Sequence, residues 1–143
     1  MDDLMLKMMQ WGQQGYNCSQ ILLLLGLDVK GESNPQLVRA AAGLAFGCGS
    51  GRAACGALTG ACCLLAFLAD SGDDSGRPAE QLPAGLQTLS DWFEKSIGQR
   101  HGGTTCEMIT GEAGPAAFRS ACGVIVADTY AKVVQIATDS GWM

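Results

Sequence analysis

Apolar residues recur along this chain at the three- and four-residue spacing of helices, and no segment shows the strict alternation of a strand. In the first segment Leu4, Met5, Met8 and Trp11 form such a stripe. Helical patterns cover residues 1–14, 18–25, 35–46, 52–68, 78–98 and 120–139. The pattern predicts an all-α protein, a compact bundle of five or six helices.

Capping and breaking residues set the expected ends of these helices. Asn17 is a good N-cap for the second helix, and Asn34-Pro35 is a strong start signal for the third. Residues 26–33, which begin at a glycine, are expected to form a loop. Pro83 either kinks the helix of residues 78–98 or makes it start late.

A glycine-rich stretch precedes the helix expected at the centre of the bundle. Gly47, Gly49 and Gly51 give the backbone conformations closed to other residues, so a loop is expected there. From Arg52 the chain carries no further charge until Asp70, which predicts a buried helix. Its hydrophobicity is too modest for a membrane span to be the better interpretation.

Gly56 and Gly60 lie four residues apart, on one face of this central helix. Something approaches the backbone closely there, either another helix or a cofactor. Arg52 flanks the loop, where its charge can steady a thiolate or another anion. The candidate cofactor-binding residues are Gly49, Gly51, Arg52, Gly56 and Gly60.

The composition fits one helical domain spanning residues 1–143. Hydrophobic residues make up 48% of the chain, enough for a sizeable core, while charged residues make up only 16%. So low a charge makes a homodimer plausible. The net charge of −5 and the lack of a basic patch argue against a nucleic-acid partner.

The seven cysteines indicate thiol or metal chemistry. Asp2 and Asp3 lie where a secretory signal needs positive charge, so a cytoplasmic location is expected. Disulfides are seldom structural in that compartment. Seven thiols in an intracellular chain suggest metal binding or redox chemistry more than stapling.

Four of the cysteines fall near expected helix N-termini: Cys18, Cys55, Cys106 and Cys122. Thr104-Thr105-Cys106-Glu107 fits a capping box, so Cys106 is expected in the first turn of a short helix that ends near Gly111. The N-terminal end of a helix lowers a thiol pKa, and the thiolate is the form that attacks disulfides and binds metals. In a compact bundle these four helix ends can converge on one site.

The other cysteines give weaker signals. Cys48 lies in the glycine loop, where exposure is expected, and Cys62 and Cys63 are interpreted as packing residues. No pair has the C-x-x-C spacing of thioredoxin-like or zinc-ribbon sites. His101, the only histidine, is interpreted as a solvated loop residue and not as a metal ligand beside Cys106.

The sequence resembles the family of small redox-active proteins named for its C_GCAxxG_C_C cysteine pattern. The resemblance rests on Gly15-Tyr16-Asn17-Cys18, the glycine loop, Cys55-Gly56-Ala57-x-x-Gly60, and the single cysteines Cys106 and Cys122. It implies that Cys18, Cys55, Cys106 and Cys122 are the functional set, with a redox role. A similar domain lies beside haem-binding segments in some cytochromes, where a cluster site has been proposed. Cys48, Cys62 and Cys63 depart from the family pattern, and no C-x-x-C-H sequence supports haem attachment here.

Three hypotheses stay open on the sequence alone. The first is thiol–disulfide chemistry or electron transfer by the four cysteines, with an unidentified redox partner. The second is an iron–sulfur cluster or another metal bound by the same four residues. The third is a non-catalytic helical interaction module whose thiols are core residues.

Overall fold

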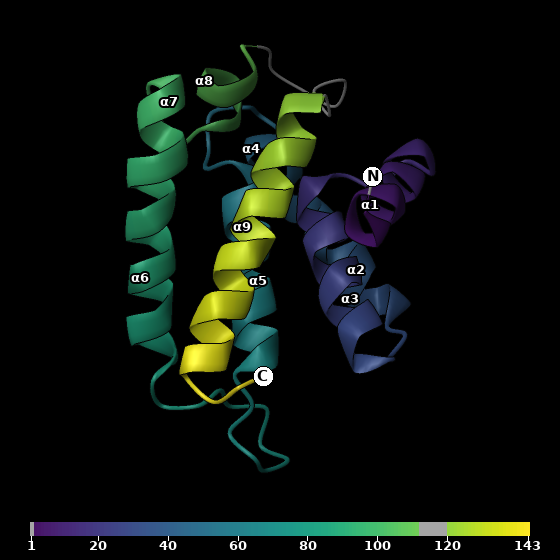
Figure 1. The fold of residues 1–143 in the computed structure, drawn as a ribbon, viewed down its shortest axis with the longest axis vertical. Coiled ribbons are helices and arrows are strands. Elements are labelled where there is room, and N and C mark those ends of the chain that lie inside the picture. Colours follow the sequence, from purple (N-terminus) through teal and green to yellow (C-terminus); the bar gives the residue numbers. More distant parts are fainter. Residues whose placement is uncertain (1, 112–119) are drawn as a thin grey trace.

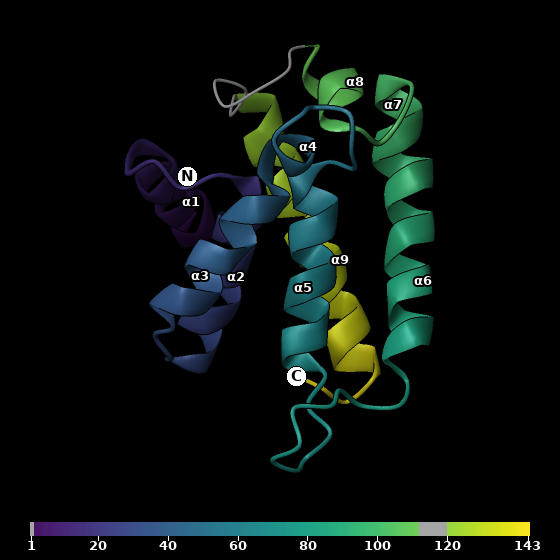
Figure 2. The ribbon, with the colours of Figure 1, turned by 180° about the vertical axis from the view of Figure 1, so that it is seen from behind.

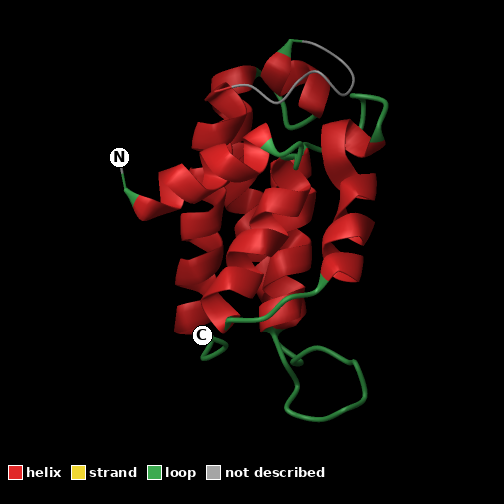
Figure 3. Ribbon diagram, turned by 90° about the vertical axis from the view of Figure 1, so that its right-hand side faces the viewer, coloured by secondary structure: helices red, strands yellow, loops and turns green. Residues whose placement is uncertain are grey.

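The computed structural model describes residues 2–111 and 120–143, and the described part of the chain contains helices and no strand (Figure 3). The helices are α1 (Asp3–Gln13), α2 (Cys18–Lys30), α3 (Pro35–Ala41), α4 (Ala45–Cys48), α5 (Gly56–Leu68), α6 (Leu82–Phe93), α7 (Gln99–His101), α8 (Cys106–Thr110) and α9 (Ser120–Asp139). The all-α prediction is therefore confirmed. No helix in these ranges is both long enough and apolar enough to cross a membrane.

Two of the expected helices are divided, so the described segments outnumber the five or six predicted. The helix expected over residues 35–46 ends at Ala41, and a 3₁₀ turn, η1 (Ala42–Leu44), leads into α4. The right-handed path is interrupted at Ala45, which is extended with a ψ of 153°. Phe46 and Gly47 then adopt left-handed dihedral angles, so α4 is a left-handed turn and does not continue the right-handed helix. The helix expected over residues 78–98 starts late, at Leu82, with Pro83 in its first turn.

The fifth expected helix also runs further than the sequence suggested. After Phe93 a π-helical turn, η2 (Glu94–Gly98), joins α6 to α7. His101, which was expected in a loop, is therefore the last residue of a helix, and the loop begins after it. The π turn adds a residue to the helical ladder without ending it.

The loop predicted to begin at Gly26 is wrong. Helix α2 continues to Lys30 and ends at Gly31, whose φ of 67° is left-handed. Gly26 lies inside α2, and a side chain there would collide with Leu64 of α5. This glycine is explained by the close approach of a neighbouring helix, not by a turn.

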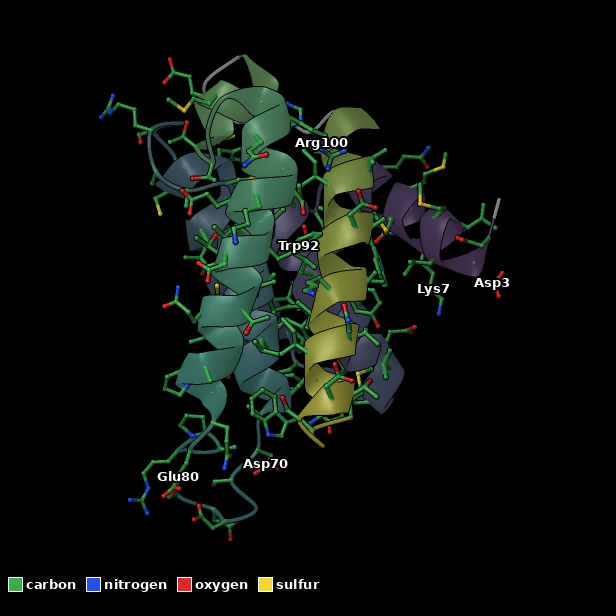
Figure 4. The ribbon with its side chains drawn as sticks, turned by 60° about the vertical axis from the view of Figure 1, so that its left-hand side comes forward. Asp3, Lys7, Asp70, Glu80, Trp92 and Arg100 are labelled. Atoms are coloured by element: carbon green, nitrogen blue, oxygen red, sulfur yellow. The ribbon has the colours of Figure 1, made fainter. Side chains whose placement is uncertain are left out.

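Three long helices begin at the same end of the bundle. In Figures 1 and 2, α2, α5 and α9 start near α4, α7 and α8, and the loop of residues 70–81 lies at the opposite end. Figure 4 places Asp70 and Glu80 in that far loop and Arg100 at the end where α9 begins. The charge-free α5 lies between α2, α6 and α9, and Ala57, Ala61, Leu64, Leu65 and Leu68 are buried in the core.

Candidate functional site

A pocket at the shared end of the bundle contains the four cysteines that sequence analysis selected. Among the described residues it is lined by Cys18, Phe46, Cys55, Ala57, Cys106, Thr110, Cys122 and Ile125. No nitrogen or oxygen atom of these residues contributes exposed surface to it. The structure therefore brings together four thiols that are far apart in the chain.

Each thiol comes from the beginning of a different helix. Cys18 is the first residue of α2, Cys55 is the N-cap of α5, Cys106 is the first residue of α8, and Cys122 is the third residue of α9. Because these helices begin at one end of the bundle, their first residues meet there (Figures 1 and 2).

Backbone hydrogen bonds tie the segments that carry Cys55 and Cys106. The Cys55 N–H donates to the carbonyl oxygen of Thr104 over 2.7 Å, and the Cys106 N–H donates to that of Ala53 over 3.3 Å. Ala54 and Thr105 form an isolated antiparallel bridge between these bonds. The two thiols are thus held in register by main-chain contacts, independently of side-chain packing.

Close packing of α2 on α5 sets the position of Cys18. A Cβ atom built on Gly56 would lie 2.6 Å from the Cys18 sulfur, and one built on Gly60 would lie 2.6 Å from the Cα atom of Ser19. Ser19 is buried, and its hydroxyl donates to the Ala41 carbonyl over 2.7 Å. Of the two candidates for this glycine face, the structure places another helix there.

The space between the thiols is very small. Its volume is about 10 Å³, which is close to the smallest cavity that can hold one water molecule. No organic substrate or cofactor fits between the sulfur atoms in this arrangement.

Burial dominates the electrostatics of the inner thiols. It raises the pKa of Cys18 to about 12 and that of Cys55 to about 11, and it also raises the pKa of Cys106. The nearby Cys55 sulfur raises the pKa of Cys18 further, whereas the backbone N–H groups of Ala57 and Leu58 lower that of Cys55. The expected net lowering of these pKa values by helix N-termini is therefore wrong, because desolvation of the thiolate outweighs the N–H groups.

Comparison with protein families decides the family of this chain. The model described as "Putative redox-active protein (C_GCAxxG_C_C)" matches residues 16–136. The chain belongs to the C_GCAxxG_C_C family. No curated protein and no solved structure matches it.

The glycines of this C_GCAxxG_C_C chain act in the scaffold around the thiols. Gly51 is buried, its N–H donates to Phe46 and its carbonyl oxygen accepts from Glu107, both over 2.8 Å. Gly49 is exposed and ends α4. Neither of them, nor Gly56 or Gly60, lines the thiol pocket.

Arg52 and the remaining thiols lie outside the pocket. Arg52 is exposed and lines a separate surface hollow with Thr105, Glu107, Met108 and Gly111. Cys48 is exposed, as expected, and Cys62 is half-buried against the core. Cys63 is exposed on α5, so its interpretation as a packing residue is wrong.

His101 ends α7 and does not line the pocket. It is half-buried, so it is less solvated than the sequence suggested.

The donor chemistry of the pocket suits a soft metal, but its spacing does not. Four thiolates are the usual ligand set of structural zinc and of iron–sulfur clusters. Within residues 2–111 and 120–143, however, no three ligand side chains lie close enough to hold one metal ion. The side chains would have to move before they could share a metal.

Sequence reasoning missed four pocket residues: Phe46, Ala57, Thr110 and Ile125. Ala57 is part of the family motif, directly after Gly56, so its place in the motif could have suggested that it lines the pocket. Phe46 had no such signal, because the helical pattern continues through it to the glycine loop. Its place follows from a left-handed backbone that hydrophobic spacing does not reveal.

Proposed function

We propose that the four pocket cysteines form a redox centre in which pairs of thiols are reversibly oxidised to disulfides. The observation that carries this proposal is their convergence on one apolar pocket with no room for an organic molecule. In such a pocket the sulfur atoms themselves are the groups available to gain and lose electrons. Membership of a family described as redox-active supports the same role.

The proposed reaction is thiol–disulfide exchange with a small disulfide or a protein disulfide. One pocket thiolate attacks the disulfide and releases one thiol, and a second pocket thiolate then displaces the other. In total, two pocket thiols become one disulfide, two electrons pass to the incoming disulfide, and the two protons go to the released thiols. The reverse reaction with a dithiol reductant restores the pocket.

The pocket offers an outer and an inner group of thiols for these two steps. Cys122 is half-buried, whereas Cys18, Cys55 and Cys106 are each no more than 8% exposed. Cys122 is the thiol that an external disulfide reaches first. An inner cysteine then completes the exchange, protected from unspecific oxidation by its burial and raised pKa.

A metal centre is the second candidate function, because four thiols from four segments match the ligand number of zinc or an iron–sulfur cluster. Cys18, Cys55, Cys106 and Cys122 would be the ligands. A bound metal keeps its thiols deprotonated, which reverses the effect of burial on their pKa values. For a single metal ion, this candidate requires movement of the ligand side chains.

The test is anaerobic purification, followed by metal analysis and thiol counting before and after treatment with oxidised glutathione. We expect metal-free protein that loses two or four thiols on oxidation and regains them with dithiothreitol. Peptide mapping should place the disulfides within the pocket set. Cys62→Ala/Cys63→Ala is the matched control, and its oxidation should be unchanged.

Two outcomes would overturn this proposal. Stoichiometric iron with sulfide, or zinc that is lost in Cys55→Ser, would establish the metal centre instead. Seven thiols that all resist oxidation in metal-free protein would favour the helical interaction module.

A further inference from the structure

The chain carries Phe46 to the thiol pocket on a left-handed turn. Phe46, Gly47, Cys48 and Gly49 follow one another with φ values of 57°, 60°, 55° and 84°. L-residues with side chains avoid this region, and a bulky residue there is a true outlier. Such outliers persist only where surrounding contacts hold them, and they gather at functional sites.

Hydrogen bonds hold this turn closed. The Gly49 N–H donates to the Ala45 carbonyl over 3.0 Å, and the Gly51 N–H donates to that of Phe46 over 2.8 Å. Gly47 is buried so close to the next stretch of loop that a Cβ atom on it would lie 2.7 Å from the Ala53 carbonyl oxygen. The turn is therefore fixed by the same loop that carries Cys55.

The effect of the turn is to place an aromatic ring in the outer wall of the pocket. Phe46 lines the pocket and is half-buried, so its side chain borders both the thiols and solvent. Among the described lining residues, only Thr110 and Cys122 share this intermediate exposure, and both have smaller side chains. Cys18, Cys55, Cys106, Ala57 and Ile125 lie behind them and are buried.

We propose that Phe46 is the gate of the thiol pocket. With the turn left-handed, the ring closes the pocket. Relaxation of the turn to an ordinary backbone conformation swings the ring away, so that the mixed disulfide formed on Cys122, or another small reagent, can reach the inner thiols. The gate sets how fast Cys18, Cys55 and Cys106 exchange, and it deepens the redox function proposed above. Its test measures access to the thiols and so does not depend on electron transfer.

The experiment compares alkylation of each cysteine by iodoacetamide in reduced, metal-free protein, followed by peptide mass spectrometry. In Phe46→Ala we expect Cys18, Cys55 and Cys106 to react at least about tenfold faster, since modification of a buried group follows the population of the open form. Cys62 and Cys63 lie on α5 roughly 10 Å or more from Cys55 along the helix, so their rates should not change.

Two further variants separate gating from general loosening. Phe67→Ala removes a half-buried phenylalanine of α5, roughly 18 Å along the helix from Cys55, and should leave the inner thiols slow. Phe46→Leu keeps an apolar side chain of intermediate size and should give an intermediate rate, which keeps the test informative if Phe46→Ala fails to fold.

Unchanged inner-thiol rates in Phe46→Ala and Phe46→Leu would overturn the gate. So would an equal acceleration at Cys62, since that would show opening of the whole bundle. If instead the gate variants accelerate alkylation but no pocket disulfide ever forms, the gate stands and the redox function fails.

Discussion

Two opposing effects act on the pKa of the Cys18 and Cys55 thiols. Backbone N–H groups at a helix start stabilise a thiolate, and removal of water destabilises it. At 8% and 7% exposure the second effect is larger, and the pKa of both thiols rises above the ordinary value of about 9. These thiols are protonated at neutral pH, so their reactivity depends on access and not on a permanently charged sulfur.

Folding stability should fall as the pH rises above 9. The unfolded thiols ionise near pH 9, whereas folded Cys18 and Cys55 hold their protons to about 12 and 11. The folded state binds more protons in that window, so the unfolded state is favoured as the pH rises. We expect each of the two thiols to cost about 1 kcal/mol of stability between pH 8 and pH 10.

This effect is measured by urea unfolding of the parent chain and of the Cys18→Ala variant, each at pH 8 and at pH 10. The contributions of lysine and tyrosine titration cancel when the unfolding free energies of the two proteins are subtracted. The stability gap between the two proteins should shrink by about 1 kcal/mol at pH 10. A gap independent of pH would mean that Cys18 is more solvated than the structure indicates.

The four cysteines that line the pocket could be selected from the sequence because local capping and spacing signals place each of them at the beginning of a helix. The sign of the pKa change could not be, since burial depends on what the other segments place above each thiol. Phe46 was missed for a related reason. A left-handed turn at a phenylalanine is imposed by the contacts of Gly47 and Gly51, which only the folded loop reveals.

Among the helices, the contact between α2 and α5 determines the geometry of the site. Glycines of both helices lie at this contact, each against a residue of the other helix: Gly26 of α2 against Leu64, Gly56 of α5 against Cys18, and Gly60 against Ser19. The pair can approach closely because these glycines have no side chain of their own to hold the two helices apart. Without this approach, Cys18 would not reach the pocket that Cys55 lines.

Gly60→Ala should therefore destabilise the bundle. Its Cβ atom would lie 2.6 Å from the Cα atom of Ser19, which is backbone, so α2 has to move. We expect a loss of roughly 1–3 kcal/mol in the free energy of unfolding, the range typical of overpacking. Guanidinium unfolding monitored by circular dichroism measures it.

Gly123→Ala is the matched control for this substitution. Gly123 lies in α9, and no described atom lies within 4 Å of the position that an added methyl group would take. Alanine should therefore stabilise the helix by roughly 0.5–1 kcal/mol. Equal effects of the two substitutions would show that Gly60 acts through helix propensity alone.

Helix existence was predicted well, and helix ends were predicted poorly, for a physical reason. Hydrophobic spacing reports which face is buried, and it continues across a break such as the one at Phe46. Gly26 shows the opposite error. A glycine at this position suggests a loop in the sequence, but it lies within α2, where Leu64 of α5 occupies the place that a side chain would take.

In the molecule as a whole, the pocket links segments that are distant in sequence. The two pocket cysteines nearest in sequence, Cys106 and Cys122, are 16 positions apart. Cys18 and Cys122 come from nearly opposite ends of the chain. The sequence allowed such a convergence but did not determine it, because it depends on α2, α5 and α9 all beginning at one end (Figure 1). The proposed oxidation of the pocket would therefore be coupled to the stability of the entire bundle.

A pocket disulfide should stabilise the folded chain by roughly 3 kcal/mol or more, because it closes a loop of at least about 15 residues in the unfolded state. By the same thermodynamic cycle, folding favours formation of the disulfide by an equal amount. Guanidinium unfolding of oxidised and reduced protein should show the higher midpoint for the oxidised form, also in Cys62→Ala/Cys63→Ala. A lower midpoint would mean that the pocket must distort to bring two sulfurs together, and the thiols would then rest in the reduced state.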